Sequence, residues 1–293
     1  MTTAYTIRHA THFVYERPVS FARCNLRLKP VDWPGQQLLT HDIGVIPDGR
    51  LTDANSRSEL LNITRLLLSN ATKTLDIISN SRVSVNRTVP EILPTDPTIA
   101  MVANWARQSH DIADSGPANF LYPSPLISPD AAIADWCADS LDPNRSVVEA
   151  VLALALRIMR DFRFDPDATK TETLPAEAFA KRAGVCQDFA QIMICGLRAA
   201  GLPAAYASGY IRTIPPEGQE RLQGADAMHG WVLVWCGPER GWIGFDPTNG
   251  IFMAGDHIIV AVGRDYRDIA PVDGIFTGYG AQEMRVAVDV LPD

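Results

Sequence analysis

Three residue types that together can perform nucleophilic catalysis occur in order along the second half of the chain. Cys186 stands at the start of an amphipathic helical pattern, His229 opens a strand pattern, and Asp246 ends the next one, 43 and 17 residues apart. A thiolate can attack a carbonyl, an imidazole can move the proton, and a carboxylate can orient the imidazole. The order and spacing therefore predict a thiol-dependent active site.

Cys186 is the most informative cysteine, because it follows Ala183-Gly184-Val185 and begins the helical pattern. The positive end of a helix dipole favours the thiolate. A buried structural cysteine is the alternative, and we assign that role to the others, Cys24, Cys137, Cys195 and Cys236. The odd number, the wide spacing and the lack of a CxxC pair predict free thiols.

His229 and Asp246 are expected to meet across a hairpin. His229 and Trp231 share one face of their strand by its period of two, and the chain turns at residues 237–241. The hairpin then brings position 246 near position 229. A structural histidine and a turn-forming aspartate are the alternatives. The other histidines lie in less ordered contexts, so we do not select them.

The first ninety residues must form the strands of a separate domain. Apolar residues alternate over residues 5–15, and short β-branched segments follow at 43–46, 60–68, 74–78 and 82–88. This spacing predicts a β-sandwich of about seven strands in residues 1–90. Three prolines in residues 90–97 then mark a boundary.

Residues 91–293 predict an α+β domain, in which helices precede an antiparallel sheet. Thr98, Ser128 and Ser146 are the expected N-caps of the first three helices, and Ser146 with Glu149 forms a capping-box pattern. The expected helices span residues 98–108, 128–141, 146–161 and 186–200, and the expected strands span 204–213, 229–236 and 241–246.

Three sequence blocks resemble the transglutaminase-like superfamily: residues 183–190 (AGVCQDFA), 228–231 (MHGW) and 241–250 (GWIGFDPTNG). The opening at 5–9 (YTIRH) and the tail at 263–271 (GRDYRDIAP) are similar to bacterial members with a β-rich N-terminal region, often called transglutaminase-like cysteine proteases. The resemblance implies a papain-like core and a Cys186–His229–Asp246 triad. Gly230 and Gln191 depart from it, since many relatives carry Ala and His there.

The expected reaction is acyl transfer at amide bonds of a peptide or protein substrate. With water as acceptor the protein is a cysteine peptidase or amidase, which we favour because no amine-binding feature is evident. An amine acceptor gives a protein-glutamine transglutaminase, and a third alternative is a non-catalytic binding module. Trp231 and Tyr122 are the candidate substrate-binding residues. No phosphate loop or metal-ligand spacing occurs, so we expect no cofactor and no metal.

Composition indicates which classes of partner and which cellular compartment to expect. The net charge of −8 argues against nucleic acid, and the lack of a signal segment or long apolar run predicts a cytoplasmic protein without a membrane partner. Residues 1–90 carry a net charge of +4 and residues 91–293 carry −12. We expect these charges to help dock the two domains and to leave an acidic surface around the site, which favours basic substrates.

Overall fold

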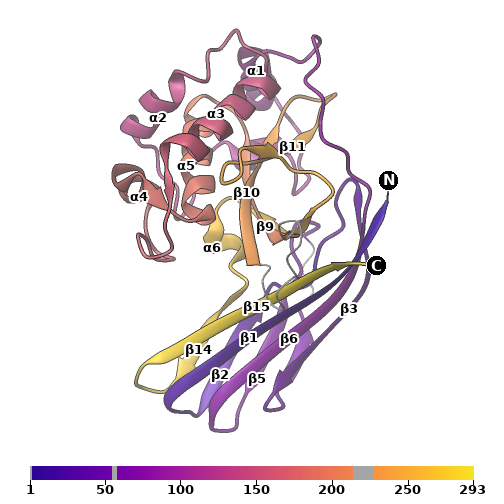
Figure 1. The fold of residues 1–293 in the computed structure, drawn as a ribbon, viewed down its shortest axis with the longest axis vertical. Helices are drawn as coiled ribbons and strands as arrows, with labels where there is room; N and C mark the ends of the chain where they lie inside the picture. Colours follow the sequence, from indigo (N-terminus) through magenta and orange to yellow (C-terminus); the bar gives the residue numbers. More distant parts are fainter. Residues whose placement is uncertain (1, 55–57, 214–226) are drawn as a thin grey trace, which may run out of the picture.

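The computed structural model describes residues 2–54, 58–213 and 227–293. In Figure 1 the chain forms a β-sandwich below and a mixed helix-and-sheet part above. The α+β fold class expected from the sequence is confirmed. Among the described residues, none of the helices has the length and apolar character that a membrane span requires.

Two antiparallel four-stranded sheets face each other in the sandwich. Their inner faces enclose a core that includes Phe13, Leu26, Leu66 and Ile77. One sheet has the order β15-β1-β6-β3, with bounds Gln282–Pro292, Thr3–Val19, Thr72–Val85 and Gln36–Ile46. The other has the order β14-β2-β5-β4, with bounds Val272–Thr277, Phe21–Leu26, Thr64–Leu68 and Arg50–Asp53.

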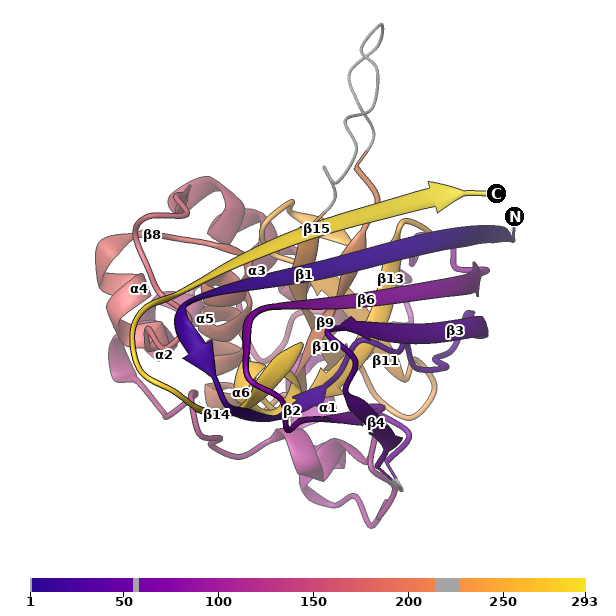
Figure 2. The same ribbon diagram turned by 90° about the horizontal axis from the view of Figure 1, so that it is seen from below.

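The last two strands of the chain belong to the sandwich. β14 pairs with β2, and β15 pairs with β1 along its length, from Tyr5 opposite Pro292 to Tyr15 opposite Gln282. Figure 2 shows β15 and β1 side by side, with the two termini close together. The sequence division into 1–90 and 91–293 assigns these strands to the second part, whereas in the structure they pair with β2 and β1. Local patterns carry no information about pairing between segments so far apart in the sequence.

A five-stranded antiparallel sheet of order β12-β11-β10-β9-β13 forms the centre of the upper part. Its strands span Ile251–Phe252, Trp242–Asp246, Ala227–Trp235, Ala204–Ile211 and His257–Gly263. Helix α5 (Cys186–Ala199) packs against β9 and β10, and ten of its residues are buried. The surrounding elements are α1 (Ile99–Arg107), η1 (Pro117–Phe120), α2 (Ala131–Ala138), α3 (Val147–Asp161), β7 (Arg163–Phe164), α4 (Pro175–Lys181), β8 (Ala183–Gly184) and α6 (Tyr266–Ile269).

Two of the three expected helix caps are confirmed. Thr98 accepts a hydrogen bond from Met101 N–H, and Ser146 accepts one from Glu149 N–H. The Ser128 cap is wrong, because Asp130 accepts from Ile133 N–H and α2 begins at Ala131. The carboxylate is the stronger acceptor and lies one residue before the first turn, so it takes the capping role.

The sandwich continues directly into the upper part. One end of the β15-β1-β6 sheet packs against β9 and β13 through buried apolar residues, among them Ile7, Val288, Tyr210 and Ile258. The face of the upper sheet opposite α5 is covered in part by Val31 and Leu60. Apolar burial therefore joins the two parts.

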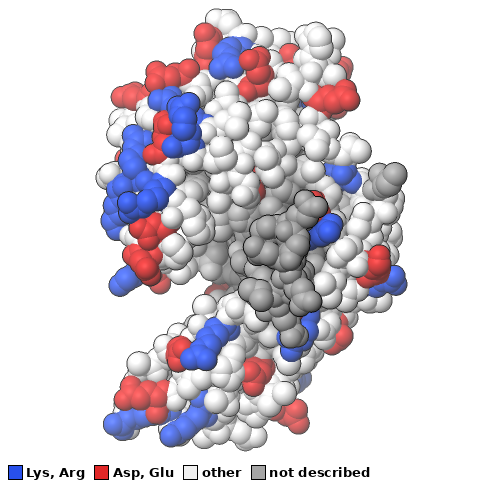
Figure 3. Space-filling view, viewed as in Figure 1, with Lys and Arg blue, Asp and Glu red and all other residues white. Residues whose placement is uncertain are grey.

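Charge does not separate the two parts in the way expected from the sequence. Within the described residues, the ion pairs that link residues 1–90 to residues 91–293 are Arg27–Asp273 and Arg82–Asp293. Asp273 lies in β14, and Asp293 follows β15, so both pairs lie within the sandwich. On the face shown in Figure 3, basic and acidic residues are interspersed over the upper and the lower part alike.

Candidate active site

Helix α5 places Cys186 at its first residue. Val185, the N-cap, has an extended backbone, and its N–H donates to the Asp188 carboxylate at 2.8 Å. Thr169 donates to the same carboxylate oxygen at 2.6 Å. A Cβ at position 184 would lie 2.5 Å from that oxygen, so Gly184 leaves the space in which Asp188 folds back. Asp188 therefore stabilises the first turn of α5.

Cys186 differs from the other cysteines in its exposure. All five cysteines are free thiols, as expected, and Cys186 is the one that is partly exposed. Burial raises the pKa of Cys24 to about 11 and that of Cys137 to about 12, and it also raises the pKa values of Cys195 and Cys236. These four thiols are therefore kept protonated in the interior.

His229 and Asp246 meet as the hairpin argument expects. The register of β10 and β11 pairs Val232 with Phe245, which brings the end of β11 beside the first half of β10. His229 Nε2 lies 2.8 Å from Asp246 Oδ2. The aspartate is fully buried and the histidine nearly so. Because Nε2 faces the carboxylate, Nδ1 is the ring nitrogen left for the thiol.

The carboxylate of Asp246 is held by several donors. The backbone N–H groups of Thr248 and Asn249 donate to Oδ1 at 2.9 and 3.2 Å, and the Asn249 side chain donates to Oδ2 at 2.6 Å. Burial alone would raise the pKa of Asp246, but hydrogen bonds with His229 and His257 hold it well below its usual range. A carboxylate with this many donors is a fixed negative charge.

Hydrogen bonding also shifts the pKa of the His229 imidazole. Burial alone would lower the pKa of His229, but hydrogen bonds with Asp246 and Cys186 outweigh burial and raise it to about 10. The contact with Cys186 brings the three predicted residues into one connected group. A thiol, an imidazole and a carboxylate in this order are the arrangement of a nucleophile, its base and an orienting group.

Sequence reasoning missed His257, which approaches Asp246 from a third strand. Its Nε2 lies 3.2 Å from Asp246 Oδ2, and only 2% of the residue is exposed. The statement that the remaining histidines lie in less ordered contexts is wrong here. His257 is the first residue of β13, and His229 is the third residue of β10, which begins at Ala227. The position of a histidine near the start of an apolar strand was therefore the available signal.

His229, Asp246 and His257 also offer possible metal-ligand atoms, which lie within 4.8 Å of one another. Imidazole nitrogen and carboxylate oxygen are ligand types that Zn²⁺ takes. The same atoms form the hydrogen bonds described above, and a bound ion would have to replace those bonds.

Of the two candidate substrate-binding residues, neither lies on an open surface beside the triad. Trp231 is fully buried, stacks on His229 with ring centroids 5.9 Å apart, and donates from Nε1 to Met253 Sδ. It therefore packs behind the histidine. Tyr122 is 66% exposed and lines a cavity of about 600 Å³ together with Phe120 and Arg264.

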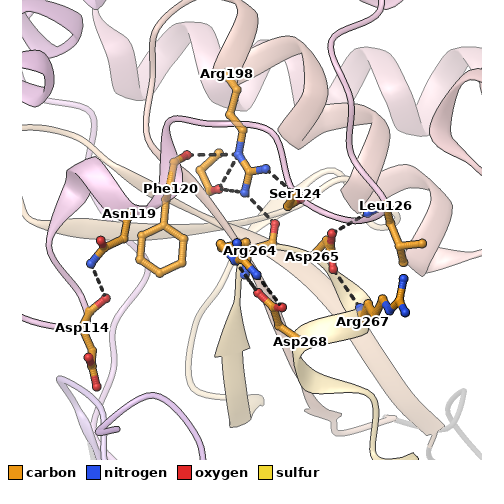
Figure 4. Close-up of polar contacts among 11 residues, drawn as sticks. Asp114, Asn119, Phe120, Ser124, Leu126, Arg198, Arg264, Asp265, Arg267 and Asp268 are labelled. Carbon is orange, nitrogen blue, oxygen red and sulfur yellow. Dashed lines mark hydrogen bonds and ion pairs between the residues drawn. The ribbon is translucent and has the colours of Figure 1, made fainter.

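The Tyr122 cavity lies by the C-terminal end of α5. Arg198 of that helix donates to the carbonyl oxygens of Phe120 and Arg264 and to Ser124 Oγ, and Figure 4 shows these contacts. Cys186 is twelve residues earlier, about 18 Å away along a helix axis. The structure therefore does not bring Tyr122 to the candidate nucleophile.

Gly230 has a steric explanation. A Cβ at this position would lie 2.1 Å from Tyr206 Oη, so the absence of a side chain admits the phenol. Burial raises the pKa of Tyr206 well above its usual value, and the charge of Cys186 raises it further. The Tyr206 hydroxyl is therefore close enough to the Cys186 thiol to interact with it electrostatically.

Comparison with known proteins shows the family of this chain. Residues 134–247 match the transglutaminase-like superfamily model, and residues 5–84 match the bacterial transglutaminase-like N-terminal region. An uncharacterised Mycobacterium tuberculosis protein is 33% identical over 300 residues, which cover 99% of this chain and 93% of that protein. The chain belongs to the transglutaminase-like superfamily.

Two further proteins extend the comparison. The structure of a candidate cysteine protease from Cytophaga hutchinsonii aligns with a TM-score of 0.77 at 20% identity, covering all of this chain and 91% of that one. This likeness concerns the fold. A protein-glutamine gamma-glutamyltransferase of Pseudomonas aeruginosa is 33% identical over 116 residues, 38% of this chain and 17% of that protein.

Proposed function

We propose that this transglutaminase-like protein catalyses thiol-dependent acyl transfer at amide bonds, with Cys186 as nucleophile, His229 as base and acid, and Asp246 as the orienting group. The observation that supports the proposal is the 2.8 Å hydrogen bond between His229 Nε2 and the buried Asp246 carboxylate, which leaves Nδ1 of the same ring for Cys186. The superfamily is generally enzymatic, which agrees with it.

Acylation follows from the position of each group. Cys186 Sγ attacks the carbonyl carbon of a peptide or isopeptide bond, and the carbonyl oxygen becomes negatively charged. The N–H of Cys186 is the proposed donor to this oxygen, since the first N–H groups of a helix have no intrahelical acceptor. The C–N bond then breaks, and His229 gives its Nδ1 proton to the departing amine. A thioester on Cys186 remains.

Deacylation returns the enzyme to its starting state. Water attacks the thioester carbonyl and gives a proton to His229, the C–S bond breaks, and the carboxylic acid leaves. We propose hydrolysis because Cys186 is partly exposed, so that water can reach the acyl group without a dedicated binding site. The protein is then a cysteine peptidase or amidase.

Labelling of Cys186 by iodoacetamide tests the thiolate–imidazolium pair. An unassisted thiol is mostly protonated at pH 6 and reacts slowly. The rate of Cys186 labelling at pH 6 should therefore fall about tenfold in His229→Gln, while the rate at pH 9 should change little. Cys195→Ala, altered in the buried face of the same helix, is the control and should behave as wild type. Equal labelling of wild type and His229→Gln at pH 6 would contradict the pair.

Activity requires a separate measurement. A peptide library incubated with the wild-type protein should yield cleaved peptides that the Cys186→Ala variant does not produce. A Cys186→Ala protein that retained full amidase activity would exclude this nucleophile.

A second candidate function is transfer to an amine. The similarity to the Pseudomonas aeruginosa protein-glutamine gamma-glutamyltransferase over 116 residues favours it. Addition of a primary amine to the same incubation separates the two, because a transglutaminase incorporates the amine and a hydrolase releases only the acid.

A further inference from the structure

His257 binds Asp246 in one defined tautomer. Its Nδ1 accepts a hydrogen bond from the backbone N–H of Ala254 at 3.4 Å, and its Nε2 lies 3.2 Å from Asp246 Oδ2. A backbone N–H can only donate, so the ring proton is on Nε2 and points to the carboxylate. His257 therefore acts as a hydrogen-bond donor to the same oxygen that His229 uses.

Aromatic packing fixes the orientation of both imidazoles. Trp231 stacks on His229 and makes an edge contact with His257, with ring centroids 5.2 Å apart in the second pair. All three rings lie almost fully within the protein. A rotation of the His257 ring would therefore disturb the packing around His229 as well.

The N-terminal part holds the backbone that carries His257. Arg87, two residues after β6, donates from Nη1 to the carbonyl oxygens of His257 at 2.9 Å and Ala254 at 3.3 Å. Burial lowers the pKa of Arg87 to about 10, which leaves it charged at neutral pH. A charged donor on two carbonyls of one turn fixes that turn more firmly than a neutral donor.

Gln36 secures the same strand two residues further on. Its amide oxygen accepts from Ile259 N–H at 2.8 Å, and its amide nitrogen donates to the Ile259 carbonyl at 2.7 Å. The pairing of β13 with β9 shifts register between Ile259 and Ala261, so the glutamine satisfies backbone groups at an irregular point. Gln36 and Arg87 thus bind the first half of β13 from the sandwich side.

We propose that His257 is a positioning residue for Asp246, and that the N-terminal part completes the active site by holding His257 through Arg87 and Gln36. This inference rests on the proposed function. Among the described residues, the charged or titratable groups near the His257–Asp246 pair are His229 on β10, Arg87 after β6, and Asp256 in the turn before β13. Asp256 is itself paired with Arg212 and accepts a hydrogen bond from Tyr5.

Substitutions at position 257 test the donor role. His257→Phe keeps an aromatic ring at this position but removes the N–H that donates to Asp246. Asp246 is then held less firmly and stabilises the His229 imidazolium less well, so the rate of Cys186 labelling at pH 6 should fall about tenfold. Labelling at pH 9, where thiols ionise without help, should stay near wild type. His257→Gln restores an N–H donor and should recover most of the pH 6 rate. Equal rates for Phe, Gln and wild type at pH 6 would overturn the proposal.

Substitutions at position 87 test the contribution of the N-terminal part. Arg87→Met removes both carbonyl contacts and should show the same selective loss at pH 6, and Arg87→Lys, which keeps a charged donor, should lose less. Arg27→Met is the control, because Arg27 also donates to a backbone carbonyl, that of Ala270 at the end of α6, and pairs with Asp273, but it does not contact the turn that carries His257. An identical loss in Arg27→Met would show that general destabilisation causes the effect, and would overturn the proposal.

This assay separates the two proposals because it needs no substrate. If Cys186 in His229→Gln is labelled as fast as in the wild type at pH 6, the proposed function fails. If it does, and His257→Phe and Arg87→Met label like wild type, only the positioning role fails.

Discussion

The carboxylate of Asp188 accepts the backbone N–H of Val185 at 2.8 Å, and this contact fixes the residue immediately before Cys186. Thr169 binds the same oxygen and so connects the segment before α4 to the helix start. The proposed nucleophile is thus placed by hydrogen bonds that do not involve its own side chain.

Removal of this contact should affect both stability and reactivity. Asp188→Ala leaves the Val185 N–H without its partner and should lower the free energy of unfolding by about 2 kcal/mol, measured in urea. It should also slow Cys186 labelling. Ser146→Ala removes a cap from α3 and should cost about 1 kcal/mol without changing labelling. Comparable slowing in both variants would argue against local placement by Asp188.

His9 should make stability depend on pH. It is buried where β1 meets β9 and contacts Thr11 and Tyr210, and burial lowers its pKa to about 4. In the unfolded chain His9 takes up a proton near pH 6.5, whereas in the folded protein it does so only near pH 4. The free energy of unfolding therefore has its full value above pH 6.5 and decreases toward pH 4, by up to about 3 kcal/mol. His9→Gln should remove this part of the pH dependence of unfolding. The exposed His110→Gln should not, and a wild-type-like profile in His9→Gln would contradict the assignment.

Gly230 should not tolerate a methyl group while Tyr206 keeps its hydroxyl. A Cβ there would lie 2.1 Å from Tyr206 Oη, so Gly230→Ala should destabilise the fold by about 1–3 kcal/mol. Tyr206→Phe in the same chain should recover part of that loss, which a double-mutant cycle of unfolding measures. Gly44→Ala is the control, since its added Cβ meets no atom within 4 Å. Strict additivity of the two changes would exclude the steric explanation.

The return of β15 should contribute to the contact between the two parts. Val288 is fully buried there, whereas Val286 on the same strand is 46% exposed. Val288→Ala should lower the free energy of unfolding by about 1–2 kcal/mol, and Val286→Ala by less than about 0.5 kcal/mol. Equal small losses from the two alanines would mean that this strand adds little to the interface.

Local patterns predicted most of the helices and the central strands. Thr98 and Ser146 gave correct helix starts because capping depends on a few consecutive residues. The pairing of β14 and β15 with the first strands was beyond such patterns, because register between distant segments depends on the assembled core. α4 was also missed, although Pro175 stands at its first turn.

The contact between His229 and Asp246 could be predicted, but its surroundings could not. His229 lies near the start of β10, and the hairpin register of β10 and β11 relates it to Asp246, so this contact follows from local geometry. His257 reaches Asp246 only through the packing of β13 against β9, and Arg87 reaches His257 only through the contact between the two parts. Exposure likewise depends on packing, which is why Trp231 proved to be buried.

The pairing of β1 with both β6 and β15 has a consequence for synthesis of the chain. Thr3–Val19 is synthesised well before its partner Gln282–Pro292. The sheet therefore reaches its full width only after β15 has been synthesised, and until then one long edge of β1 has no partner. An unpaired strand edge is a site of aggregation, so nascent chains that stall before residue 282 are the form of this protein most in need of chaperones.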